Sequence, residues 1–150
     1  MLQAYPGYPR RRALIDLGSD VMFGGPAWAF ADAYSAHAPT QMYRFDYFGL
    51  SLRMLGLGAT HGSEIVHVQH SYASFIGRKL HPPSGGDCSR RWGRRMQRAW
   101  LDFAHGEGVG EAQWPLYETE HRRTRLIMTA RDVVAEDPDA VRRTAWAGVY

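Results

Sequence analysis

The stretch Gly58-Ala59-Thr60-His61-Gly62-Ser63-Glu64-Ile65-Val66 places one histidine in a glycine-flanked turn, just ahead of an apolar run. Glycine at positions 56, 58 and 62 lets the backbone bend sharply and approach its neighbours closely, which is typical of a loop. An imidazole titrates near neutral pH, so it can take up and return a proton. His61 is therefore the candidate catalytic residue.

The segment before this turn has the pattern of a strand. In residues 41–48 the aromatic residues Tyr43, Phe45 and Tyr47 alternate with Met42, Arg44 and Asp46, which predicts two distinct faces. Ligands of open α/β sheets bind at the carboxyl ends of strands. A histidine about a dozen residues beyond such an end lies where chemistry is expected.

Helices and further strands are expected along the rest of the chain. Gly24-Gly25 should end a helix that contains residues 14–22, and Pro26 should open a second helix that runs to about residue 38. Residues 81–89 read as a loop, with Ser89 as the cap of a helix that runs to Gly106 and turns Trp92, Met96, Trp100 and Phe103 inward. Residues 124–130 form a candidate strand, and Asp137 should cap a closing helix.

The chain of 150 residues, 45% hydrophobic and 22% charged, has the composition of one globular domain. It contains no apolar run near the roughly 18 residues that a membrane span needs, and its N-terminus lacks the apolar core of a signal peptide. We therefore expect no membrane association. The single cysteine, Cys88, excludes an internal disulfide and fits a reducing compartment, so we expect a cytoplasmic location.

The His61 stretch resembles the type-B carboxylesterase family, the group of cholinesterases and para-nitrobenzyl esterases, whose catalytic histidine stands in a His-Gly-x-Glu-hydrophobic motif. Here the motif reads His61-Gly62-Ser63-Glu64-Ile65. Four further blocks resemble the family in the same order: residues 14–23 with Pro26, residues 41–48, residues 96–104 followed by the Trp-Pro-Leu-Tyr of 114–117, and Asp137-Pro138 before Arg142 and Trp146. Together they cover the C-terminal third of the family.

The resemblance implies an α/β fold, specifically the C-terminal strands and helices of an incomplete α/β-hydrolase domain that spans residues 1–150. It implies carboxylic ester hydrolysis, with His61 as the general base and acid and Glu64 as a supporting carboxylate. It implies no cofactor. In α/β-hydrolases the serine and the acid precede the histidine, and this chain has no Gly-x-Ser-x-Gly elbow. Its partners would be a small ester substrate and an N-terminal esterase polypeptide that carries the serine and the acid.

Three other interpretations remain. The chain could be an inactive, degenerate esterase fragment. It could be a small nucleic-acid-binding module that uses Arg90 to Arg98, because residues 78–98 carry seven basic residues against Asp87 alone. A solvated basic face of one helix explains that cluster better. A metal site at His61, Glu64, His67 and His70 is disfavoured, because zinc helices place two histidines four residues apart rather than three.

Overall fold

The computed structural model describes residues 1–59, 61–80, 87–106, 114–127 and 132–150. They form two compact units, each of which we describe by itself. Unit 1 consists of Met1–Met42, Pro115–Thr124 and Val134–Tyr150, and unit 2 consists of Tyr43–Trp114 and Arg125–Val133. No helix of the described part is long and apolar enough to cross a membrane.

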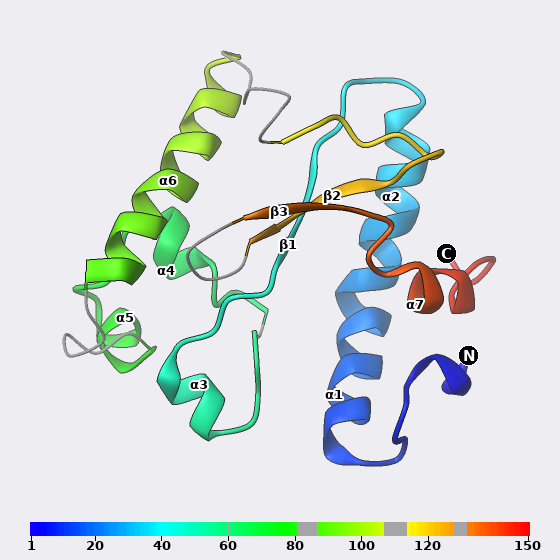
Figure 1. Ribbon diagram of the computed structural model, residues 1–150, viewed down its shortest axis with the longest axis horizontal. Coiled ribbons are helices and arrows are strands. Elements are labelled where there is room, and N and C mark those ends of the chain that lie inside the picture. The colour runs from blue at the N-terminus through cyan, green and yellow to red at the C-terminus, as the bar shows by residue number, and fades with distance from the viewer. Residues whose placement is uncertain (60, 81–86, 107–113, 128–131) are drawn as a thin grey trace. The chain divides into compact units, whose positions relative to one another are not determined.

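Unit 1 is built mainly from one long helical column. A short 3-10 turn, Leu2–Ala4, precedes helix α1 (Arg11–Ser19), which continues through a π-helical turn (Asp20–Gly24) directly into α2 (Gly25–Ser35) (Figure 1). The prediction that Gly24-Gly25 ends the first helix is wrong. Gly25 has helical backbone angles, and a side chain there would overlap the Tyr150 ring. These glycines therefore allow close packing inside a helix instead of ending it.

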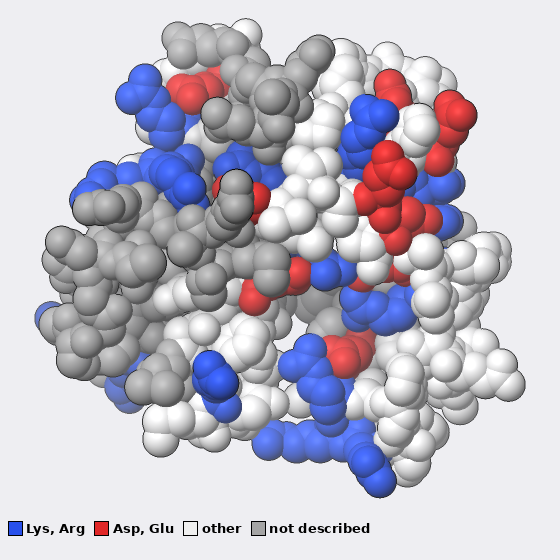
Figure 2. All heavy atoms as spheres, in the orientation of Figure 1, with Lys and Arg blue, Asp and Glu red and all other residues white. Residues whose placement is uncertain are grey.

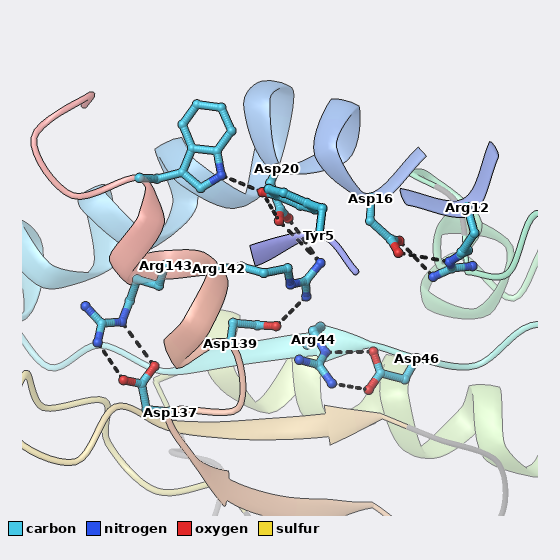
Figure 3. Close-up of polar contacts among 11 residues, drawn as sticks. Tyr5, Arg12, Asp16, Asp20, Arg44, Asp46, Asp137, Asp139, Arg142 and Arg143 are labelled. Atoms are coloured by element: carbon cyan, nitrogen blue, oxygen red, sulfur yellow. Dashed lines mark hydrogen bonds and ion pairs between the residues drawn. The ribbon is translucent and has the colours of Figure 1, made fainter. Parts of the chain in front are cut away.

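A buried polar network lies beside the small apolar cluster of Ala4, Tyr5 and Ala13. The Tyr5 hydroxyl donates to Asp20 over 2.8 Å and accepts from the Trp146 indole over 2.6 Å, and Arg142 pairs with Asp20 over 3.3 Å (Figure 3). The buried partners satisfy each other's hydrogen bonds. The network thus ties Tyr5, the π-helical turn that follows α1, and the closing helix α7 (Ala140–Ala145) together.

Three short strands form one sheet in the order β1-β2-β3: β1 is Met42–Phe45, β2 is Arg123–Ile127 and β3 is Val133–Glu136. The Asp46 amide, just after the end of β1, donates to the carbonyl of Ile127, the last residue of β2, over 2.9 Å. Because the C-terminal ends of the two strands meet, β1 and β2 run in the same direction. The Asp137 amide, just after the end of β3, donates to the carbonyl of Arg122, just before the start of β2, over 3.1 Å, so β3 runs antiparallel to β2. A mixed sheet accompanied by helices confirms the expected α/β class.

In unit 2, short helices α3 (Leu50–Met54), α4 (Ile65–Val68) and α5 (Phe75–Leu80) precede the long helix α6 (Asp87–Ala104) (Figure 1). The expected common face of Tyr43, Phe45 and Tyr47 is confirmed, because all three pack against the cluster of Met96 and Ile127.

The buried side of α6 differs from the prediction. Gly93, Met96 and Ala99 are buried, whereas Trp100 and Phe103 are 38% and 56% exposed. Small residues at 93 and 99 let neighbouring elements approach α6 more closely than the large aromatic side chains would allow. The side chain of Trp92 lies outside the described part.

The ends of two helices also differ from the prediction. Helix α6 begins at Asp87, so Ser89 lies within the helix rather than at its cap. The N-cap position of α7 is held by Asp139, whereas Asp137 adopts a positive φ of 38° and pairs with Arg143. Residues 81–86 of the predicted loop 81–89 and residues 128–130 of the predicted strand lie outside the described residues, and residues 87–89, also predicted as loop, belong to α6.

Candidate active site

His61 stands on the turn between α3 and α4, and its side chain is exposed. The turn depends on three glycines with positive φ, at positions 56, 58 and 62 with angles of 65°, 72° and 78°. Residues with a Cβ rarely adopt this region, so the glycines make the predicted sharp bends possible. The Gly62 carbonyl then accepts the Ile65 amide over 3.2 Å and leads the chain into α4.

The residues that follow His61 are anchored in unit 2. Ser63 is 5% exposed, Val66 is 4% exposed and His67 has no exposed surface, while α4 packs against α6. The loop thus exposes His61, while Ser63, Val66 and His67 behind it are buried. Such an arrangement presents a side chain to another reactant while its backbone is held by the core.

His67 is buried among three aromatic rings, whereas His61 is exposed, so the two histidines do not share an accessible surface. Its ring centroid lies 5.6 Å from that of Phe45, 5.3 Å from that of Tyr47 and 5.4 Å from that of Tyr72. Its Nδ1 is 2.7 Å from the Tyr72 hydroxyl oxygen. Within the described ranges, no group of three or more histidine, cysteine, aspartate or glutamate residues is placed to hold a metal ion.

Glu64 is half-buried at the N-cap position of α4. Its backbone carbonyl accepts the amides of His67 and Val68 over 2.9 and 3.0 Å, so it starts the helix. Its charge also acts on Tyr43, since burial first and the Glu64 carboxylate second raise the pKa of Tyr43 to about 12. Support of His61 by the Glu64 carboxylate stays a prediction.

The four acidic residues before His61 each have a partner of their own. Asp16 pairs with Arg12 over 2.9 Å and Asp46 with Arg44 over 2.8 Å. Asp20 belongs to the buried network of unit 1, and Asp32 accepts the Tyr117 hydroxyl over 2.7 Å as well as both arms of Arg122 over 3.1 Å. These contacts give each carboxylate a structural role; that the catalytic acid is not among them stays a prediction.

The serines near the turn lack the setting of a nucleophile elbow. Ser51 lies within helix α3, whereas an elbow serine stands on a sharp turn between a strand and a helix. Ser63 is buried.

The roles of Tyr72 and Gly93 were not predicted from the sequence, and His67 was considered only as a metal ligand. The aromatic residues at 43, 45 and 47 predict an apolar face of the strand that a following helix has to cover. This pattern could have indicated that the helix with His67 is buried.

No family model matches the chain. It is 32% identical over 119 residues to the cocaine esterase of Oryctolagus cuniculus, a match that covers 75% of this chain and 21% of that enzyme. It is 31% identical over 140 residues to the para-nitrobenzyl esterase of Bacillus subtilis, covering 91% of this chain and 27% of the relative. The structure of a thermophilic PNB esterase superposes with a TM-score of 0.78 at 25% identity, covering 96% of this chain and 29% of the other. The chain thus spans roughly a quarter of the length of these relatives.

Proposed function

We propose that the chain, which belongs to the type-B carboxylesterases and corresponds in sequence and fold to the C-terminal part of such an enzyme, supplies the histidine of a serine esterase. The proposed reaction is the hydrolysis of a carboxylic ester. The observation that carries this proposal is the exposed His61 on a glycine-rich turn, in the motif His61-Gly62-Ser63-Glu64-Ile65, ahead of the buried Val66 and His67.

His61 would act twice in this reaction. A serine attacks the ester carbonyl while the imidazole takes the serine's proton, and the imidazolium then gives that proton to the departing alcohol. In the second half of the cycle the imidazole takes a proton from water, which attacks the acyl-serine, and returns the proton to the serine. An exposed imidazole on an anchored backbone suits this work, because the serine has to approach it from another part of the protein.

The serine and the carboxylic acid would come from the part of the esterase that precedes this segment in the family's order. That part is proposed as the partner of the chain, whether it belongs to the same polypeptide or to another. The substrate class is a small carboxylic ester. Cytoplasmic location, based on the single cysteine, stays a prediction.

Complementation tests the proposal. The matched C-terminal part of the Bacillus subtilis para-nitrobenzyl esterase is replaced by this chain, and hydrolysis of p-nitrophenyl acetate is followed for the fusion, for the shortened esterase and for the chain alone. We expect hydrolysis by the fusion only. A well-folded fusion without activity would favour an inactive fragment instead. A burst of product from the chain alone, with covalent labelling of Ser51 or Ser63 by an organophosphonate, would contradict the proposal.

The alternative of a nucleic-acid-binding module gains no support from the described charges. On helix α6, Arg95 lies 3.7 Å from Asp132 and Arg98 lies 3.7 Å from Asp102. Figure 2 shows both basic and acidic side chains on the face that it draws. Binding of phosphate backbones calls for a stripe of one sign, so mixed charges of this kind do not favour the module.

A further inference from the structure

Tyr72 is buried and hydrogen-bonded in the segment behind His61. Its side chain is 6% exposed and its hydroxyl oxygen lies 2.7 Å from Nδ1 of the fully buried His67. The Ser71 amide next to it donates to the Val66 carbonyl over 3.0 Å, so the chain folds back on α4 at this point. The bond between Tyr72 and His67 therefore closes a small loop of residues 67–72. His61 lies six residues before the start of this loop.

Two glycines enclose Tyr72 from opposite ends. A Cβ at Gly77 of α5 would overlap the Ser71 carbonyl oxygen and lie 2.8 Å from the Tyr72 Cα. A Cβ at Gly93 of α6 would overlap the Tyr72 hydroxyl oxygen and lie 3.1 Å from its Cζ. Both glycines are buried. The backbone and the hydroxyl of Tyr72 thus fit into spaces that any larger residue would fill.

We propose that Tyr72 is a positioning residue: its hydroxyl, seated against Gly93 and bonded to the buried His67, fixes α4 and with it the loop that presents His61. The inference rests on the proposed function, because it assigns to this contact the geometry that proton transfer by His61 needs. Reactions of this kind lose rate steeply when a reacting group is displaced by about 1 Å. A loop that exposes its reactive side chain needs such an anchor nearby.

Hydrogen exchange of the full-length chain tests the anchor without any assay of activity. Removing the hydroxyl with Tyr72→Phe should speed exchange of the amides of residues 63–71 by about fivefold to tenfold, the effect of one lost buried hydrogen bond. Tyr117→Phe is the matched control, since it removes a tyrosine hydroxyl bond of the same 2.7 Å length, to Asp32 in unit 1. The control should leave exchange in residues 63–71 unchanged.

A double variant makes the test specific to the contact with Gly93. Gly93→Ala alone should speed exchange of residues 63–71 by more than about tenfold, because the new methyl group displaces the hydroxyl. In the Tyr72→Phe background the overlapping oxygen is absent, and alanine is also the better helix former. There Gly93→Ala should add less than about threefold. Additive effects of the two changes, or unchanged exchange in Tyr72→Phe, would overturn the proposal.

The active fusion separates positioning from simple stability. Tyr72→Phe should lower kcat for p-nitrophenyl acetate about tenfold at unchanged KM, whereas Tyr117→Phe should change neither. Faster exchange without a loss of kcat would reduce Tyr72 to a structural residue and overturn the proposal. A fusion that is inactive even with the wild-type sequence would count against the proposed function, and the exchange experiment would still decide whether Tyr72 anchors the loop.

Discussion

Arg125 and Asp132 form an ion pair inside unit 2 on which the stability of the chain should depend. Arg125 is 7% exposed, its Nε donates to Asp132 over 3.1 Å, and its second arm bonds the same carboxylate oxygen. The guanidinium also lies 5.4 Å from the centroid of the Trp114 ring. A buried guanidinium that loses its counter-charge is strongly destabilising, even where the intact pair contributes little.

Asp132→Ala should lower the free energy of unfolding by about 2–4 kcal/mol, near the lower end of such losses because Asp132 keeps 15% of its side chain exposed. At about 2–4 °C per kcal/mol for a chain of this size, the melting temperature should fall by about 4–16 °C. Replacing both partners, as in Arg125→Met with Asp132→Leu, should restore most of the loss, because no unpaired charge remains buried.

Thermal unfolding followed by circular dichroism measures the difference. Arg98→Ala is the matched control, because it removes an arginine that is 80% exposed and pairs with Asp102 over 3.7 Å. Exposed pairs of this kind contribute little, so the control should shift the melting temperature by no more than about 2 °C. Equal shifts for Asp132→Ala and Arg98→Ala, or no recovery in the double variant, would refute the reasoning.

Three other expectations concern unit 1 and the active fusion. Burial raises the pKa of Asp20, so its ionised form is disfavoured in the folded chain. The wild type should therefore lose stability relative to Asp20→Asn as pH rises through that pKa. If urea unfolding gives the two proteins the same dependence of unfolding free energy on pH between about pH 3 and 7, the expectation is wrong. Glu64→Gln should lower kcat of the fusion about tenfold to a hundredfold, and an unchanged kcat would remove Glu64 from the site. A chelator should leave the ester hydrolysis rate of the fusion unchanged, whereas inactivation would revive a metal site.

The fold class and the turn were predictable from sequence because they depend on local patterns. The likeness to PNB esterase structures confirms the α/β-hydrolase class, and the alternation of Tyr43, Phe45 and Tyr47 does correspond to one packed face. The glycines around His61 predicted a sharply bent loop, and the structure has positive φ at these glycines and an exposed His61. These features need no knowledge of distant contacts.

Features that depend on distant contacts were predicted wrongly or missed. Gly25 reads as a helix end, yet its role is to admit Tyr150, which lies at the other end of the sequence. Trp100 reads as a core residue of α6, yet the core side is chosen by Gly93, which admits the Tyr72 hydroxyl. A buried histidine such as His67 is unexpected from its polarity, because its bond to the Tyr72 hydroxyl and its ring contacts with Phe45 and Tyr47 are not visible in the sequence.

The most direct measurement is the kcat of the fusion with His61→Ala, read beside His37→Ala as a matched control at another exposed histidine. A general base and acid acts in the transition state, so His61→Ala should lower kcat by about three orders of magnitude or more at nearly unchanged KM. Free imidazole added to the buffer should restore part of the lost rate in this variant alone. A correctly folded His61→Ala fusion with the kcat of the wild type would contradict the assignment of His61.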